Sequence, residues 1–226
     1  EIVRRLGFGE RVAEAVRSID EHWDGRGYPR GQRGAEIPLL ARIICLAQIV
    51  EVSAKLNGPA DGLDAACARR GGWFDPTLVT ACRGIEPELE RWCALDHDGL
   101  SRAVREREPG GAGLLAGDGI LDRIAVGFAE IVDAKSPYTA RHSYRVNQLA
   151  LQIGGRLGMS HAGLAELRRA ALLHDIGKLS VPNSILDKPG PLSVAEWEKV
   201  RLHPYYTLRI LEHIRGIERI AFVASA

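Results

Sequence analysis

The sequence lacks the features that mark membrane-spanning or disulfide-stabilised proteins. Its longest apolar stretch, residues 37–50, is interrupted by Arg42 and Gln48 and is shorter than the roughly 20 residues that cross a bilayer. Its four cysteines form no C-x-x-C pair, and a chain of 226 residues needs no disulfide to hold its core. We therefore expect small buried cysteines, a cytoplasmic location and no membrane contact.

The chain also lacks an excess of charge of either sign. Lysine and arginine number 30 against 29 aspartate and glutamate residues, so no broad positive field is available for a nucleic acid. A content of 46% hydrophobic and 26% charged residues is typical of a folded globular protein. An anionic ligand must therefore be held by a local group of residues. The composition leaves the oligomeric state open.

Strict alternation of apolar and polar residues is absent too, whereas helical periodicity recurs. Residues 120–132 and 146–157 carry apolar residues at helical spacing, and we expect both to be amphipathic core helices. In contrast, residues 96–118 are rich in glycine and charge, and we expect them to link a domain at 1–95 to one at 119–226. The first residue is not Met and the last residues are apolar, so both ends are expected to be cut from a longer polypeptide.

Capping signals place two further helices in the C-terminal part. Ser160 is expected to cap a helix that ends near Gly177. Ser193 with Glu196 has the spacing of a capping box, and the helix that follows is expected to end near Pro204. The C-terminal part is therefore predicted to be an array of helices.

His174 and Asp175 are adjacent at the end of an apolar helix, where a core needs neither residue type. Burying them without partners would cost several kcal/mol. Imidazole and carboxylate suit Mn, Fe or Zn, and His142 and His203 supply imidazoles from two other helices. Taken alone, His203 beside a proline is more typical of a histidine with no ligand role. Lys178, one turn beyond Asp175, is well placed to stabilise charge on a phosphoryl group.

Three stretches occur in the order and spacing of a known family: P-Y-T-A-R-H-S-Y-R-V, A-L-L-H-D-I-G-K-L-S-V-P-N-S-I-L-D-K-P-G-P-L and R-L-H-P. Through them, residues 120–226 resemble the N-terminal half of an HD-GYP domain. The resemblance implies an all-α helical bundle of the HD type, a centre of two or three metal ions, and hydrolysis of the phosphodiester of cyclic di-GMP.

The resemblance also implies roles for individual residues. Four positions match metal ligands of the family: His142, His174, Asp175 and His203. Asp175 stands where the family bridges two ions, and Lys178 stands where it has a lysine that faces the substrate phosphate. Some members bind a third ion through a glutamate four residues before the first histidine, where this chain has Tyr138. Two divalent ions, such as Fe or Mn, are therefore expected.

Near the other end, E-H-W-D-G-R-G-Y-P-R-G-Q-R-G-A-E-I-P-L-L-A-R-I resembles the signature loop of the same family's C-terminal half, and the likeness covers residues 10–85. The order of the two halves is thus reversed. The simpler interpretation is a tandem pair of HD-GYP-like domains, with the end of one copy followed by the start of the next. The second copy is then truncated at its C-terminus, and full phosphodiesterase activity is expected to need residues beyond this chain. The alternative is a circular permutation in which the two halves pack together.

The first copy departs from the family pattern. Ile19 and Asp20 replace a His-His pair, Gln48 replaces a metal-binding aspartate, and Asn57 and Ala60 replace two basic residues that hold the substrate. Ile19 cannot bind a metal and Gln48 lacks charge, so we expect this copy to be inactive.

Two other interpretations stay open for the whole chain. It could be an HD phosphohydrolase that acts on another nucleotide or phosphate ester, or a regulatory module whose inactive copy binds a partner or a nucleotide. Glu21, His22 and Asp24 are interpreted as the solvated approach to the glycine-rich loop.

Overall fold

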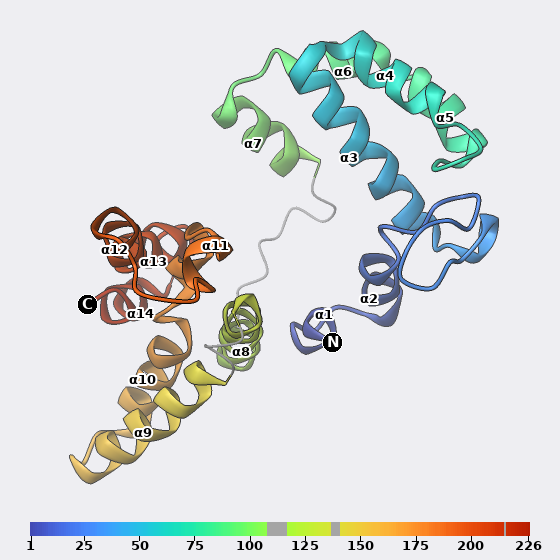
Figure 1. Ribbon diagram of the computed structural model, residues 1–226. Helices are drawn as coiled ribbons and strands as arrows, with labels where there is room; N and C mark the ends of the chain where they lie inside the picture. Colours follow the sequence, from blue (N-terminus) through green and yellow to red (C-terminus); the bar gives the residue numbers. More distant parts are fainter. Residues whose placement is uncertain (108–116, 137–140, 215) are drawn as a thin grey trace. The chain divides into compact units, whose positions relative to one another are not determined.

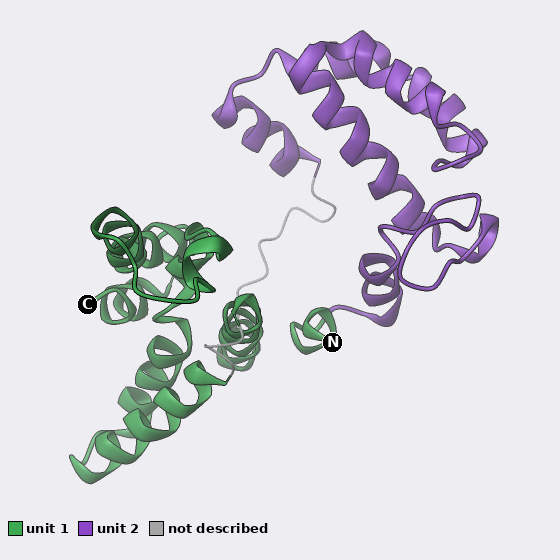
Figure 2. Ribbon diagram, in the orientation of Figure 1, with its two compact units in different colours: residues 1–7, 115–226 green, residues 8–114 purple. Residues whose placement is uncertain are grey.

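The computed structural model describes residues 1–107, 117–136, 141–214 and 216–226 (Figure 1). These residues form helices and turns, and their one strand-like pairing is an isolated bridge between Arg70 and Phe74. The predicted all-α fold is confirmed. The chain separates into two compact units, unit 1 with residues 1–7 and 115–226, and unit 2 with residues 8–114 (Figure 2). Within the described ranges, no helix is both long and apolar enough to cross a membrane.

Unit 2 is built around the long helix α3 and its partner α4 (Figure 1). Its helices are α2 (Glu10–Arg17), η1 (Gly34–Glu36), α3 (Leu39–Asn57), α4 (Pro59–Ala68), α5 (Pro76–Arg83), α6 (Glu86–Cys93) and α7 (His97–Glu106). The main core cluster consists of buried apolar residues from α3 to α6: Leu46, Val50, Ala54, Leu63, Ala66, Phe74, Val79 and Leu89. All four cysteines of the chain are free. The expectation that they are buried is wrong, because Cys45, Cys67 and Cys82 are only half-buried and Cys93 is exposed.

The glycine-rich loop of unit 2 is organised by Glu21. This carboxylate is buried, with 2% of its surface exposed, and accepts hydrogen bonds from the backbone N–H groups of Arg30 (2.6 Å) and Gln32 (2.9 Å). The ring of His22 stacks on Trp73 at 4.4 Å between centroids. The interpretation of Glu21 as part of a solvated approach is therefore wrong: the carboxylate holds the loop by satisfying two of its backbone donors.

Helix α7 lies inside the segment predicted to be a linker. Asp96 caps it by accepting a hydrogen bond from the backbone N–H of Gly99 (2.8 Å), and Leu100 and Val104 share one face at helical spacing. The cap and the short apolar stripe thus favour a helix at residues 97–106, although the segment is rich in glycine and charge. Residues 108–116, the middle of the predicted linker, lie outside the described residues.

Unit 1 contains the helices α1 (Ile2–Arg5), α8 (Asp118–Lys135), α9 (His142–Arg156), α10 (His161–Leu173), η3 (Ile176–Ser180), α11 (Asn183–Leu186), α12 (Val194–Arg201), α13 (His203–Leu211) and α14 (Glu218–Ala224). Its core joins α8, α10, η3, α13 and α14 through buried residues such as Ala129, Leu172, Ile176, Leu211 and Ala221. Although the sequence placed residues 1–7 with the N-terminal domain, α1 packs on α8. Leu6 fits there because Gly127 has no side chain: a Cβ would lie 2.4 Å from its Cδ2.

The helix starts predicted for unit 1 at Ser160 and Ser193 are confirmed, but the face of α9 predicted to be buried is not. Ser160 and Ser193 cap α10 and α12 as expected. Helices α9 and α10 lie side by side (Figure 1), but the expected core stripe of α9 is largely exposed, at 60% for Leu149 and 60% for Ile153. The adjacent face, which carries Gly154, packs on α10, and Gly154 allows close approach: a Cβ there would lie 3.0 Å from Leu164.

Candidate metal centre

The His-Asp pair lies at the junction between α10 and η3. Helix α10 ends at Leu173, His174 is its C-terminal cap residue, and Asp175 immediately precedes η3. The apolar neighbours Leu172, Leu173 and Ile176 are buried in the core of unit 1, which fixes the backbone on both sides of the pair. As a result the Asp175 side chain is held in the interior, with 2% of the residue exposed.

Three histidines from different elements surround the Asp175 carboxylate. The Nε2 atoms of His142, at the start of α9, and of His174 lie 3.7 Å and 3.3 Å from Oδ2. The Nε2 atom of His203, at the start of α13, lies 3.6 Å from the other oxygen, Oδ1. The structure therefore brings all four residues singled out in the sequence to one point, with histidines on both sides of the carboxylate.

Backbone carbonyls orient two of the imidazole rings. Nδ1 of His174 lies 2.9 Å from the carbonyl oxygen of Ala171, and Nδ1 of His203 lies 2.7 Å from that of Val200. A carbonyl can only accept, so Nδ1 carries the proton and donates in each case. With Nδ1 held by a carbonyl, Nε2 is the nitrogen of each ring that faces Asp175, an arrangement common among metal-binding histidines.

The third ring, His142, is positioned through its neighbour. Ser143 is fully buried and donates its hydroxyl to Oδ1 of Asp133 at 2.8 Å. Asp133 lies near the end of α8, so this contact ties the start of α9 to that helix. A carboxylate at the N-terminus of a helix is also favoured by the helix dipole. Asp133 thus holds the helix turn that carries His142.

Lys178 and Asp175 form a close ion pair. The Lys178 Nζ atom lies 2.7 Å from Oδ2, the same oxygen that faces His142 and His174. Burial alone would raise the pKa of Asp175, but hydrogen bonds from His174 and Lys178 outweigh it and lower the pKa well below its usual range. The hydrogen bond to Asp175 raises the pKa of His174 against the opposite effect of burial. The carboxylate is therefore anionic and attracts cations.

These donors fit a divalent metal ion. Two ligand atoms that each bind one ion at roughly 2.1 Å lie about 3.0 to 3.4 Å apart, depending on the coordination geometry. The separations of 3.3 to 3.7 Å between the histidine nitrogens and the Asp175 oxygens are close to that spacing. Ligand atoms of His142, His174 and Asp175 all lie within 4.8 Å of one another. An ion bound there would draw these ligand atoms closer together.

Gly177 permits the contact between the His-Asp turn and α13. A Cβ at this position would lie 1.9 Å from the carbonyl oxygen of His203 and 2.6 Å from the backbone nitrogen of Thr207. The sequence predicted that Gly177 ends a helix, but the chain continues directly into η3. The glycine is needed for close approach between two backbones.

We expect Gly177→Ala to lower the free energy of unfolding of unit 1 by about 3 kcal/mol or more, because the new methyl group overlaps backbone atoms that cannot move independently. Gly155→Ala is the matched control, since a Cβ there meets nothing within 4 Å. It should raise stability by about 0.5 to 1 kcal/mol through helix propensity. Chemical denaturation of both variants measures the difference, and similar midpoints would contradict the predicted overlap.

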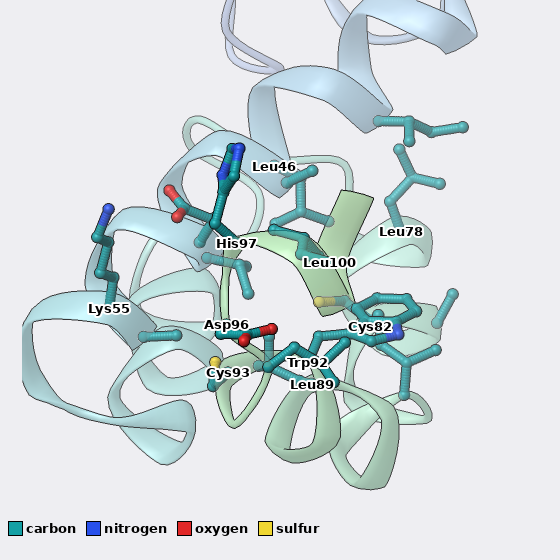
Figure 3. Close-up of a pocket in the computed structure, with 18 residues that line it drawn as sticks. Leu46, Lys55, Leu78, Cys82, Leu89, Trp92, Cys93, Asp96, His97 and Leu100 are labelled. Carbon is teal, nitrogen blue, oxygen red and sulfur yellow. The ribbon is translucent and has the colours of Figure 1, made fainter. Parts of the chain in front are cut away.

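The positions of the first copy lie in unit 2 and show a different environment. Asp20 and Gln48 are exposed, and Ile19 is half-buried. A cavity of about 850 Å³ in this unit is lined by α3, α5, α6 and α7, with apolar residues such as Leu46, Leu89 and Leu100 and the polar groups of Lys55 and Asp96 (Figure 3). None of its lining residues belongs to the His-Asp cluster, so this cavity is separate from the candidate metal centre.

Comparison with protein families matches residues 1–78 and 128–226 to the HD domain. The chain belongs to the HD domain family. Membership implies dependence on a divalent metal ion, and the His142, His174 and Asp175 cluster of this HD domain could hold one. The resemblance stated from the sequence is thereby confirmed at the level of the family.

Individual relatives agree with this assignment. The chain is 42% identical over all 226 residues to the 3'3'-cGAMP-specific phosphodiesterase 3 of Vibrio cholerae, and covers 49% of that protein. It is 42% identical over 86 residues, 36% of the chain, to the cyclic di-GMP phosphodiesterase of Thermotoga maritima, and covers 23% of it. The crystal structure of a cyclic GMP-AMP-specific phosphodiesterase of V. cholerae matches with a TM-score of 0.71 and 40% identity, over 99% of this chain and 59% of that chain.

The sequence motifs did not identify two residues that support the site. Asp133 and Thr207 do not belong to the family signature, although Thr207 follows His203 by four residues and so shares its helix face. Tyr138, on which the expectation of two rather than three ions rests, lies outside the described residues.

Proposed function

We propose that this HD domain protein is a metal-dependent phosphodiesterase that hydrolyses a cyclic dinucleotide. The observation that carries the proposal is the convergence of three histidine Nε2 atoms on the two oxygens of one buried aspartate. Relatives named as cyclic di-GMP and 3'3'-cGAMP phosphodiesterases support the substrate class. The chain spans about half the length of the relative that it matches throughout, so the activity of the whole protein is part of the proposal.

We propose two divalent ions, such as Fe or Mn, with His142, His174, Asp175 and His203 as ligands. The two oxygens of Asp175 face different histidines, and this arrangement supports a carboxylate that bridges two sites. A carboxylate with a lowered pKa stays ionised and can offer both oxygens. Divalent ions in such a site lower the pKa of water and neutralise charge on a phosphodiester.

The residues of the chain would supply the remaining steps. The carbonyls that hold Nδ1 of His174 and His203 keep both rings in one orientation, so little rearrangement is needed when the substrate binds. Lys178 would leave its contact with Asp175 in part and offer N–H donors to a phosphate oxygen as negative charge builds on it. Addition of water across one P–O bond opens the ring and yields a linear dinucleotide.

Cyclic di-GMP is the substrate implied by the sequence motifs, and 3'3'-cGAMP is a specific second candidate. The relative that aligns over the whole chain and the matching crystal structure both carry cyclic GMP-AMP in their names. The two substrates differ in one purine base, so both would fit the same phosphodiester chemistry.

We also propose that residues 1–95 and 119–226 are halves of two successive HD-type copies, of which the first is inactive. The family match in two separate stretches supports this division. The replacements at Ile19, Asp20 and Gln48 support the loss of activity in the first copy. The packing of α1 on α8 places residues 1–7 in unit 1, with the second copy, without changing the proposal.

The test is turnover of both cyclic dinucleotides before and after removal of the metal with a chelator. In the full-length protein we expect hydrolysis in the presence of Mn²⁺ or Fe²⁺, its loss on chelation, and its return when the ion is added back. Linear dinucleotides are separated from the cyclic substrates by chromatography. Hydrolysis that is insensitive to chelation would contradict the metal-dependent mechanism. Binding of a cyclic dinucleotide without turnover in the metal-loaded protein would favour the regulatory module instead.

A further inference from the structure

The hydroxyl of Thr207 connects the two parts of unit 1 that carry the proposed ligands. It accepts a hydrogen bond from the backbone N–H of Gly177 at 3.0 Å and donates one to the carbonyl oxygen of His174 at 3.0 Å. Thr207 is fully buried, with 0% of its surface exposed. Its single donor and one of its acceptor sites are thus used in a dry environment.

These two hydrogen bonds satisfy backbone groups that have no partner at the ends of helices. The carbonyl of His174 follows the last turn of α10, and the N–H of Gly177 lies in the first turn of η3. Groups at such positions have no partner within their own helix. A threonine inside a helix commonly bonds to the carbonyl four residues earlier, which here belongs to His203. Thr207 reaches across to the His-Asp turn instead.

The position of Thr207 makes this link relevant to the spacing of the site. Thr207 lies one turn beyond His203 on α13, so a fixed hydroxyl also fixes the start of that helix. The other end of the link is the backbone of His174, directly before Asp175. Gly177 allows the approach, because the space that a Cβ would fill is occupied by the carbonyl oxygen of His203. One hydroxyl therefore joins the element with His203 to the element with His174 and Asp175.

We propose that Thr207 is a positioning residue that sets the distance of His203 from the His174 and Asp175 pair. The inference rests on the proposed function in that the three residues are taken as metal ligands. Thr207 itself touches neither an ion nor a substrate. Without its hydroxyl, the backbone N–H of Gly177 and the carbonyl of His174 lose this partner, and the link between α13 and the turn is weakened. A site that spans both elements would then bind an ion less tightly.

The experiment compares variants that differ only in this hydroxyl. Thr207→Val replaces it with a methyl group of similar size, and Thr207→Ser keeps it. Thr80→Val is the matched control, because Thr80 is exposed on α5 and bonds only within its own helix. Binding of Co²⁺ is followed by its visible absorption at a temperature where every variant is folded. Hydrogen exchange at the Gly177 amide reports the link without any metal.

We expect Thr207→Val to weaken Co²⁺ binding about 10-fold or more, the range seen when groups that orient metal ligands are removed. Its Co²⁺ spectrum should change and its Gly177 amide should exchange faster. Thr207→Ser and Thr80→Val should stay within about threefold of wild type in affinity. If Thr207→Val does not fold, Thr207→Ala against Thr207→Ser makes the same comparison, since these two differ by the hydroxyl alone.

The experiment distinguishes failure of the proposed role of Thr207 from failure of the proposed metal centre. Equal Co²⁺ affinity and equal spectra in the wild-type protein and the variants without the hydroxyl would overturn the role of Thr207 and leave the proposed function intact. A wild-type protein that binds no Co²⁺ would overturn the proposed metal centre, and the role of Thr207 with it. A loss of thermal stability with unchanged Co²⁺ affinity would assign Thr207 to the core alone and would also overturn the inference.

Discussion

Replacement of Asp175 by alanine is expected to abolish metal binding and to lower phosphodiesterase turnover by about 1,000-fold or more. Both of its oxygens face histidine nitrogens, at 3.3 to 3.7 Å, so the variant loses the group shared by every proposed ligand. Three histidines alone carry no negative charge to offset that of a divalent ion. The substitution also leaves the partly buried ammonium group of Lys178 without its carboxylate.

The measurements for Asp175→Ala are metal content by elemental analysis and turnover of the cyclic dinucleotides. Asp64→Ala is a suitable control, because Asp64 is exposed on α4 in unit 2. Circular dichroism checks that both variants keep their helices. Retention of metal and of turnover within about tenfold of wild type in Asp175→Ala would contradict the proposed centre.

Lys178→Ala is expected to lower the catalytic rate about 100-fold or more while metal content persists. The Lys178 Nζ atom lies 2.7 Å from Asp175, and 19% of its side chain is exposed, so a phosphate bound beside the carboxylate would lie within its reach. In this position a cation stabilises the charge that develops on the phosphoryl oxygens. As an ordinary lysine near a helix end it would contribute only ~0.3 to 1 kcal/mol, and turnover would hardly change.

The experiment separates these two roles of Lys178. Lys178→Ala and Lys178→Arg are compared with Lys199→Ala, which removes an exposed lysine from the last turn of α12. A catalytic rate that falls in Lys178→Ala but not in Lys199→Ala, with metal content unchanged in both, supports a role in transition-state stabilisation. A rate within about threefold of wild type would show that Lys178 takes no part in the reaction.

The caps of α10 and α12 were predictable from the sequence, whereas the buried face of α9 was not. Serine caps are local signals, because the side chain bonds to a backbone group three residues away, and both Ser160 and Ser193 act as expected. Periodicity identified α8 and α9 as helices but assigned the wrong side of α9 to the core. Amphipathic spacing identifies an apolar face, whereas the partner surface decides which face is covered, and here Gly154 offers the closer approach to α10.

The sequence by itself determined the helical class, the caps, the HD family resemblance and the residue types of the candidate site, because each depends on neighbours along the chain. Only the tertiary structure decided which atoms meet. It placed histidines on both oxygens of Asp175, brought Thr207 to the turn between His174 and Gly177, and buried Glu21 beneath its loop. These contacts join residues that are far apart in sequence or on different elements, and their geometry follows from how helices pack, which no local pattern encodes.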